Sequence, residues 1–252
     1  MLENLFGLRE KETEEHWVSI SDVMAGLMVI FLFIAISYML HSNRKTDQIK
    51  NLLGAHTNLH EDLSRELHDE FEGTPMNERQ FRTIWQGRLS AKSLSIRFKR
   101  PFSQGDAVVP ENFKNVLDEF FPRYIAILTK TEYKDGIEEI RIEGHTSSEW
   151  FDRVGIDEAY YNNMELSQDR ARNVLQYVLE IRHPTIIDNK EWIKKSLTAN
   201  GLSSSKLIFD SDGEQNSEES RRVEFRVVTK SEKLIGEIQE LLKEFGRTEV
   251  IK

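Results

Sequence analysis

An uninterrupted apolar run near the N-terminus constrains this chain more than any other feature of its sequence. Residues 23–40 read VMAGLMVIFLFIAISYML, eighteen residues without a charge. A run of this length and composition predicts a membrane-spanning helix. Trp17 and Tyr38 stand near its two ends, and aromatic side chains favour the membrane–water interface. The sequence therefore predicts one membrane span over residues 17–40.

Asp22 is the only acidic or basic residue inside this predicted span. A carboxylate in the membrane costs about 2.5–3.5 kcal/mol on insertion scales, so it is expected to face a partner or a water-filled path. Ser19, Ala25 and Gly26 lie on the same helical face, and small residues let another helix approach closely. The pattern predicts an ion- or proton-translocating carboxylate in a packed helix interface. The alternative is that Asp22 reaches the membrane surface and takes no part in transport.

Outside the apolar run the chain is hydrophilic, with 31% charged residues among its 252 residues. This composition describes an anchored protein with a large water-facing part rather than a multi-span transporter. The net charge of −9 argues against a nucleic-acid partner, and no cysteine is present to form a disulfide or a thiolate metal site. The segment before the apolar run is acidic and no cleavage site follows that run, so we expect an uncleaved anchor.

Basic residues on either side of the span give a weak signal for its orientation. Arg9 and Lys11 precede the span, whereas Arg44, Lys45 and Lys50 follow it. By this excess of one charge the C-terminal part would face the cytoplasm. A difference of one charge is too small to fix the orientation.

The sequence pattern divides the chain into five segments. We expect a short polar tail, the membrane span, a helical tether, a domain of mixed helices and strands, and a final amphipathic helix. The predicted segments are residues 1–16, 17–40, 41–80, 81–230 and 231–252.

The tether carries apolar residues at alternating spacings of three and four. Such a seam predicts a parallel homodimer, because the membrane anchor raises the local concentration of a second copy. The alternative is an amphipathic helix that packs on its own domain. Residues Gly73-Thr74-Pro75 are expected to end the helix. The seam consists of Ile49, Leu52, His56, Leu59 and Leu63, and Leu67 and Phe71 continue it.

The domain beyond the tether alternates between strands and helices. Its strands have apolar residues at every second position, which is typical of a sheet with one buried face, and its helices carry an apolar stripe. The order predicts an α+β fold with helices on one face of a sheet. The predicted strands are residues 94–98, 137–142, 197–202 and 222–228, and the predicted helices are 164–182, 231–245 and those that start at Pro110 and Trp192.

Four short motifs follow one another in this domain: FSQG at 102–105, IEGHT at 142–146, NMELSQDRA at 163–171 and ESRRVE at 219–224. In this order they resemble the OmpA-like peptidoglycan-binding domain, over about residues 94–228. The resemblance implies that an arginine binds a carboxylate of diaminopimelate in the peptidoglycan stem peptide, since guanidinium and carboxylate pair through two bonds. The site residues implied are Arg170, which is that arginine, with Ser147, Asn163, Leu166 and Arg222.

Two positions depart from the family pattern. The family has an aspartate after G-H-T, which is Ser147 here, and an asparagine in the last motif, which is Ser220 here. The segment SEWFDRVG also lengthens the loop that precedes the third motif. Asp152 or Asp157 could replace the missing carboxylate, and both possibilities stay open at this point.

The implied site residues also have structural alternatives. Arg170 could pair only locally within the scaffold, and Arg222 could form a structural ion pair under the sheet. His145 is expected to be a turn residue rather than a metal ligand, because no second ligand sits at a suitable spacing. The chain has no glycine-rich phosphate loop, no nucleophile elbow and no H-E-x-x-H motif, so we expect no enzyme activity, cofactor or metal.

Trp17, Asp22, Met24 and Leu27 have the spacing W-x4-D-x-M-x-x-L. Together with the domain behind it, this segment resembles the MotB-like B subunit of rotary stator motors, and in particular the B subunit of Zorya-type anti-phage defence systems. The resemblance implies a homodimer inside five copies of a multi-span A subunit in the bacterial inner membrane. It also implies a cytoplasmic N-terminus, a periplasmic domain on the peptidoglycan, and a proton or sodium ion that passes by Asp22. The alternatives are a passive membrane-to-wall tether and a flagellar-type stator subunit.

Overall fold

A computed structural model gives the fold of the chain. The chain divides into two compact units, residues 1–53 and 54–252, and each is described by itself. The backbone is described for residues 3–150, 154–230, 232–233 and 236, and the side chains for 23–41, 43–44, 58–150, 154–230, 232–233 and 236.

The described elements are helices and five strands. The helices are α1 (Glu3–Glu72), α2 (Pro75–Arg79), the short turns η1 (Gln80–Ile84) and η2 (Ala91–Ser93), α3 (Glu111–Leu128), α4 (Thr131–Lys134), α5 (Ile156–Glu180), α6 (Pro184–Asp188), α7 (Lys190–Ser196) and α8 (Ser217–Ser220). The strands are β1 (Gly87–Ser90), β2 (Ser95–Lys99), β3 (Ile137–His145), β4 (Leu197–Gly201) and β5 (Arg222–Thr229).

The first unit consists of the N-terminal part of α1. Within it, Val23–His41 is long and apolar enough to cross a membrane, with a mean hydropathy of 2.5 and none of it buried by the chain itself. Such a surface is stable only against lipid or the helices of another protein. Trp17, Ser19 and Asp22 belong to α1, and their side chains lie outside the described residues.

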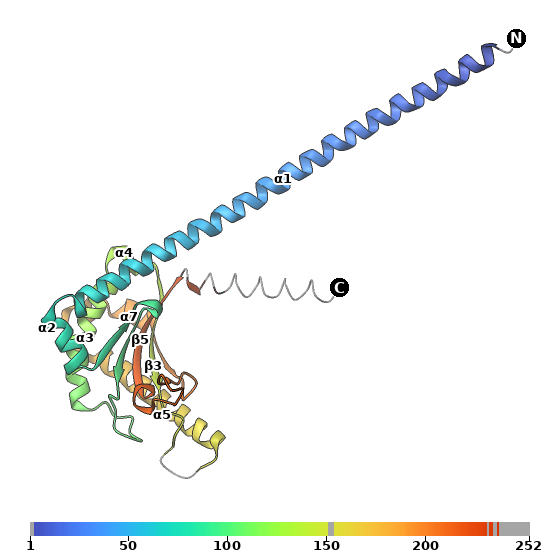
Figure 1. Ribbon diagram of the computed structural model, residues 1–252. Coiled ribbons are helices and arrows are strands. Elements are labelled where there is room, and N and C mark those ends of the chain that lie inside the picture. The colour runs from blue at the N-terminus through green and yellow to red at the C-terminus, as the bar shows by residue number, and fades with distance from the viewer. Residues whose placement is uncertain (1–2, 151–153, 231, 234–235, 237–252) are drawn as a thin grey trace. The chain divides into compact units, whose positions relative to one another are not determined.

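The second unit is built on a five-stranded sheet in the order β1-β2-β5-β3-β4 (Figure 1). Neighbouring strands are antiparallel except β3 and β4, which run parallel. The strand β5 comes last in the sequence of the sheet yet lies at its centre. With helices packed on this sheet, the fold is α+β, as the sequence predicts.

Alternation along the strands gives the sheet one apolar face and one charged face. Ile142 of β3 pairs with Phe225 of β5, and both are fully buried. Phe225 packs edge to face against Phe120 of α3, with ring centroids 5.1 Å apart. Figure 1 shows α3 and α5 beside the sheet. On the same two strands, Glu143 pairs with Glu224 on the opposite, charged face. The core of the domain therefore lies between the sheet and these helices.

Two glycines allow α5 to lie directly on the sheet. A Cβ atom at Gly144 would lie 2.3 Å from the carbonyl oxygen of Ser167, and one at Gly201 would lie 2.4 Å from the amide nitrogen of Gln168. The side chains of the same two helix residues accept backbone hydrogen bonds, Ser167 from Ser203 and Gln168 from Gly201. These contacts hold α5 over the C-terminal ends of β3 and β4.

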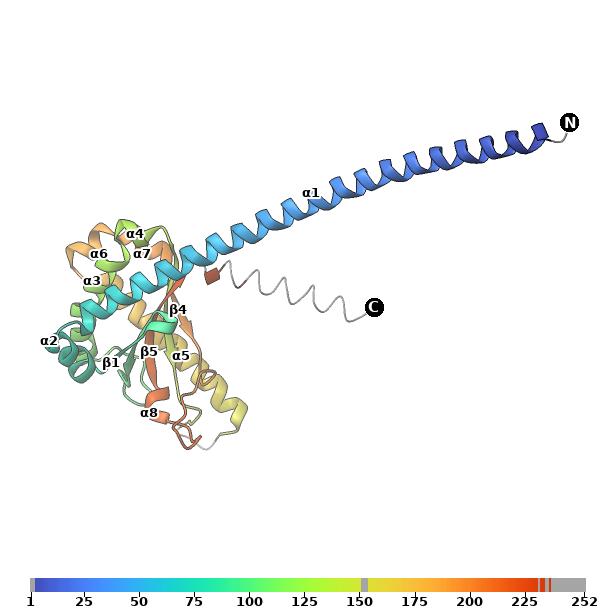
Figure 2. The same ribbon diagram turned by 45° about the horizontal axis from the view of Figure 1, so that its top comes forward.

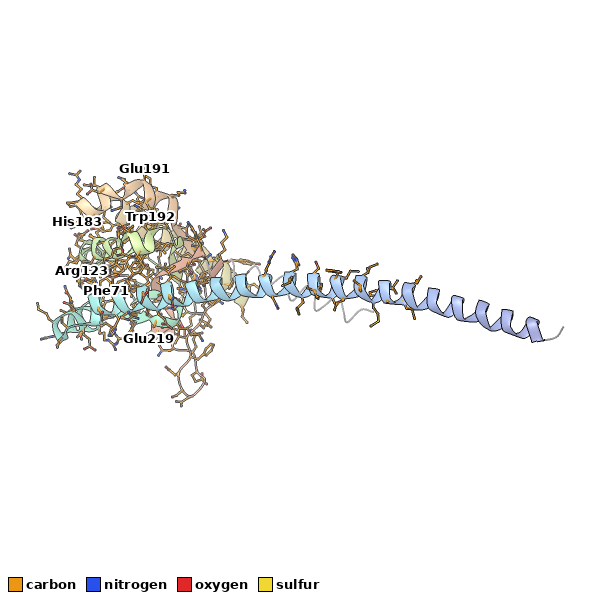
Figure 3. The ribbon with its side chains drawn as sticks, turned by 90° about the horizontal axis from the view of Figure 1, so that it is seen from above. Phe71, Arg123, His183, Glu191, Trp192 and Glu219 are labelled. Carbon is orange, nitrogen blue, oxygen red and sulfur yellow. The ribbon has the colours of Figure 1, made fainter. Side chains whose placement is uncertain are left out.

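The last part of α1 packs into the core of its own domain. Leu63, Leu67 and Phe71 are at most 1% exposed, and the ring of Phe71 lies 5.4 Å from that of Phe120. Figure 3 shows Phe71 next to Arg123, whose guanidinium lies 5.1 Å from the ring. This part of the tether packs on its own domain and does not form a seam with a second copy. The side chains of Ile49, Leu52 and His56 lie outside the described residues.

Several predicted boundaries agree with the structure, and others differ. The helix α1 ends at Glu72, and α2 begins at Pro75 behind the capping residue Thr74, as the Gly-Thr-Pro break predicts. The short strand β1 was not predicted, and α5 begins eight residues earlier than expected, at Ile156 rather than residue 164. Around α3, the short helices α4, α6 and α7 form a further group (Figure 2). Most of the predicted C-terminal helix, 231–252, lies outside the described residues.

Candidate functional site

Four of the five residues that the motifs single out meet at one cavity of about 280 Å³. Ser147 follows β3, whereas Asn163, Leu166 and Arg170 come from α5. The three helix residues are spaced by three and four, so they share one face of α5. Since Gly144 brings this helix down onto β3, that face meets the loop that leaves the strand. The packing of α5 on the sheet therefore brings these equally oriented side chains to one cavity.

Arg170 is a buried side chain of the cavity that is fixed by hydrogen bonds. It is 6% exposed, and its Nε and Nη2 atoms donate to the carbonyl oxygens of Asp106 at 2.7 Å and Ser103 at 2.8 Å. Its guanidinium lies over the ring of Phe102, 5.1 Å from the centroid. Within the described residues it forms no ion pair. A fixed cation that is bound only by neutral groups is prepared to receive an anion.

The pKa of Arg170 is lowered to about 10, chiefly by burial; the charge of Asp106 opposes this effect and the smaller influence of Arg221 adds to it. This value is still well above neutrality, so the guanidinium stays charged at physiological pH. The shift shows that its charge is poorly solvated in the folded protein. An anion bound beside it would restore part of that lost stabilisation.

Ser147 and Asn163 form the buried wall of the cavity. Both are 3% exposed, and the Nδ2 atom of Asn163 donates to the carbonyl oxygen of Glu149 at 3.2 Å. This bond ties the loop after β3 to α5. Asn163 thereby positions the loop residues that follow Ser147, in addition to lining the cavity itself.

An acidic residue of this loop, Glu149, lines the cavity together with Trp150. Its Oε1 atom accepts a hydrogen bond from the hydroxyl of Ser217 at 3.2 Å. Asp157, one of the two expected substitutes for the family's aspartate, is exposed in the first turn of α5 and does not line the cavity. The other, Asp152, lies outside the described residues. Glu149 was not predicted as a site residue, although its charge and its position two residues after Ser147 would have indicated it.

The paired arginines of the last motif have different roles. Arg222 is 7% exposed, and its Nε atom binds Glu224 at 2.5 Å while Nη1 donates to the carbonyl oxygens of Lys206 and Ser220. This is the structural ion pair of the alternative interpretation, and Arg222 does not line the cavity beside Ser147. Its neighbour Arg221 does, together with Arg170. The second arginine of the site is therefore Arg221.

Two carboxylates and an imidazole gather under the charged face of the sheet. Candidate ligand atoms of Glu143, His145 and Glu224 all lie within 4.8 Å of one another. The sequence alone does not place Glu224 beside His145, because the two residues are brought together by the pairing of β3 with β5. Arg222 already binds Glu224, and Arg97 lies directly across from it. Arg222 therefore offsets the charge of Glu224, and the cluster is a charge network.

The cavity thus presents charges of both signs. Arg170 and Arg221 supply positive charge, Glu149 supplies negative charge, and Trp150 and Leu166 supply apolar surface. A ligand that carries both a carboxylate and an ammonium group, as a free amino-acid end does, matches this distribution.

Comparison with known proteins supplies a full-length relative. No family model matches the chain. The Zorya protein ZorB of Escherichia coli is 40% identical over 233 residues, which cover 91% of this chain and 94% of that protein.

Solved structures that resemble the chain do so at low identity and low TM-score. The OmpA-like domain of FopA1 from Francisella tularensis is 14% identical with a TM-score of 0.36, and covers 57% of this chain and 80% of that one. A MotB-like protein from Desulfovibrio vulgaris is 22% identical with a TM-score of 0.38, covering 66% and 94%. A periplasmic domain of Helicobacter pylori MotB is 17% identical with a TM-score of 0.38, covering 60% and 85%. On its identity to the curated relative over nearly the whole length of both proteins, the chain belongs to the family of the Zorya protein ZorB.

Proposed function

We propose that this chain is the B subunit of an ion-driven motor of the bacterial inner membrane, and that the motor serves Zorya anti-phage defence. The observation that carries the proposal is the 40% identity to Zorya protein ZorB across 91% of the chain and 94% of that protein. The apolar stretch Val23–His41 supports a single-pass anchor. The N-terminus would be cytoplasmic and the domain periplasmic.

The membrane part of the proposal assigns the driving step to Asp22. Two copies of the chain would place their spans inside five copies of a multi-span A subunit. Asp22 would bind and release a proton or a sodium ion, since a neutralised carboxylate can pass an apolar wall and an ionised one is held at a polar contact. One charge that crosses a potential of 100 mV releases about 2.3 kcal/mol, and this energy would turn the A subunits about the dimer.

The domain would hold the dimer still by binding peptidoglycan. Arg170, fixed by two backbone carbonyls, would bind the carboxylate of diaminopimelate in the stem peptide. Asn163, Leu166 and Ser147 would shape the cavity around it, and Glu149 would receive the ammonium group. Anchored in this way, the B subunits resist rotation, and the torque acts on the A subunits.

Replacement of Asp22 tests the motor directly. Asp22→Asn keeps the shape of the side chain but cannot titrate, so we expect loss of phage protection in plaque assays on cells that carry the complete defence operon. Asp69→Asn changes an exposed carboxylate further along the same helix and should leave protection intact. Co-purification of the A subunit checks that both variants assemble.

The possible outcomes separate the candidate functions. Protection that persists in the assembled Asp22→Asn variant would contradict ion-driven function and leave a passive membrane-to-wall tether. No protection from the wild type, together with an effect on swimming, would instead assign the chain to a flagellar-type stator.

A further inference from the structure

The candidate site is one end of a longer groove. Its cavity shares Gln104, Arg170 and Arg221 with a narrow cavity of about 30 Å³. That narrow cavity shares residues 100–103 with a larger one of about 780 Å³. Residues 100–105 therefore line a path from the candidate site to the larger cavity.

The larger cavity gathers basic side chains. Five basic residues line it against two acidic ones, Glu218 and Glu219 of α8. The whole chain has 43 acidic and 34 basic residues, so this local positive excess runs against the composition. A cleft lined by one sign of charge concentrates ions of the opposite sign. The basic residues are Arg82, Arg88, Arg97, Lys99 and Arg100.

Two of these cations, Arg88 and Arg97, lie directly opposite each other on β1 and β2. No ion pair joins either of them to a carboxylate in the part of the chain that the structure describes, although Arg97 also has Glu224 opposite it on β5, on the side away from Arg88. The Nη1 atom of Arg88 donates to the carbonyl oxygens of Arg82 and Gly87, and the Nε atom of Arg97 is buried without a hydrogen-bond partner among the described residues. Like charges at directly opposed strand positions repel, and an anion between them would relieve that repulsion.

The other cations of the groove show which anion it suits. Lys99 binds Glu219 at 2.9 Å and Arg100 binds Glu218 at 2.5 Å, so the larger cavity already accommodates carboxylates. These side chains are partly exposed, and such pairs are weak enough to exchange for another carboxylate. At the junction with the candidate site, the Nε atom of Arg221 is also buried and has no partner among the described residues.

We propose that the groove binds a second carboxylate of the same wall polymer, with Arg88 and Arg97 as its ligands, while Arg170 binds the first. The inference rests on the proposed attachment to peptidoglycan. A polymer with carboxylates at intervals along its length engages both ends of the groove at once, and linking the two contacts raises affinity through effective concentration. A small fragment with one stem peptide fills the Arg170 cavity alone.

The test compares a long ligand with a short one. Detergent-solubilised full-length protein is sedimented with purified peptidoglycan sacculi, and its binding of a free stem tripeptide that contains diaminopimelate is measured by calorimetry. We expect Arg88→Gln combined with Arg97→Gln to weaken sacculus binding about tenfold or more, because one of two linked contacts is lost. Binding of the tripeptide should stay at the wild-type level.

A matched double variant controls for the loss of charge. Arg65→Gln with Arg172→Gln removes two arginines whose side chains are 66% and 65% exposed and which line no part of the groove, so both affinities should be unchanged.

Two results would overturn the second contact. In the first, the Arg88/Arg97 variant binds sacculi as tightly as the wild type does, while Arg170→Ala fails to bind them. This result would leave the proposed wall attachment at Arg170 intact. The other is equal loss of sacculus and tripeptide binding by the Arg88/Arg97 variant, which would place the defect in the Arg170 cavity. Wild-type sacculus binding by Arg170→Ala would instead refute the wall attachment at this site.

Discussion

At the scale of single residues, the site combines a rigid cation with a carboxylate on a loop. Arg170 has two of its nitrogens bound to backbone carbonyls, which reduces the entropy that it loses when a ligand binds. Glu149 is exposed, but Ser217 and the backbone bond from Asn163 hold its position. The two charges would orient a ligand with both a carboxylate and an ammonium group.

Replacement of Glu149 tests that orientation. Glu149→Gln should weaken sacculus sedimentation several-fold, because the ligand's ammonium group loses a charged partner. Chemical acetylation of the amino groups in the sacculi should weaken the wild type to the level of the variant and leave the variant unchanged. The control is Glu158→Gln, which changes an exposed carboxylate in the first turn of α5. If acetylation weakens both proteins equally, Glu149 is not the partner of the amino group.

The residues of the site were partly predictable from the sequence. Asn163, Leu166 and Arg170 were predicted because the third motif resembles the OmpA-like pattern, and their spacing of three and four places them on one helical face. Arg221 and Glu149 were missed for a physical reason. Which arginine of an adjacent pair lines a pocket depends on the register of the following strand, and Arg222 is occupied because it stands two positions before Glu224 on the charged face of β5.

At the scale of elements, the end of α1 is part of the domain core. Its apolar residues Leu63, Leu67 and Phe71 contribute to the same cluster as α3 and the sheet. The periodicity of the sequence fits a seam between two helices and a helix on its own domain equally well, because both bury the same stripe. The burial of Leu63 and Leu67 and the contact of Phe71 with Phe120 show that this segment packs on its own domain.

Shortening Leu67 measures this packing. Leu67→Ala should lower the free energy of unfolding by about 2–5 kcal/mol, since the side chain is fully buried and leaves a cavity. His68→Ala, on the exposed side of the same turn, should change it by less than about 0.5 kcal/mol. Urea unfolding of the solubilised protein, followed by tryptophan fluorescence, gives both values. A loss of stability in Leu67→Ala that disappears at high protein concentration would indicate a seam between copies instead.

The strand β1 shows why short edge elements escape sequence patterns. Its four residues, GRLS, have no run of β-branched or aromatic side chains. The backbone of Gln86, just before β1, and of Leu94, in the connection from β1 to β2, adopts positive φ values of 53° and 45° without glycine. Pairing with β2 therefore fixes β1 through tertiary structure rather than through local preference.

At the scale of the whole molecule, charge is distributed unevenly over a protein with a net charge of −9. The charged face of the sheet carries carboxylates whose proton affinity is altered by folding. Burial raises the pKa of Glu224, but the charge and hydrogen bond of Arg222 outweigh this effect and leave the pKa below its ordinary value of 4.5. Burial of Glu139 is likewise outweighed by bonds from Thr198 and Arg141, which lower its pKa.

Acid titration of stability reports this network. A carboxyl group with a lower pKa in the folded than in the unfolded state stabilises the fold above about pH 4.5, and that stability is lost as the pH falls through the folded pKa. We expect Glu224→Gln to be less stable than the wild type at pH 7 and to lose less stability between pH 6 and 3. Glu214→Gln, at an exposed loop position, should follow the wild type. If the free energy of unfolding of the wild type and of Glu224→Gln changes in parallel with pH, the lowered pKa of Glu224 is contradicted.

The central position of β5 has a consequence for how the domain is made. Synthesis proceeds from the N-terminus, so the residues of β1, β2, β3 and β4 are all synthesised before those of β5, the strand that joins β2 to β3. Each half then has an open edge where β5, residues 222–229, will insert. Contacts between distant parts of a chain form late and slowly. The sheet of a nascent chain therefore cannot close until residue 229 has been added, so the last strand to be synthesised completes the fold of the whole domain.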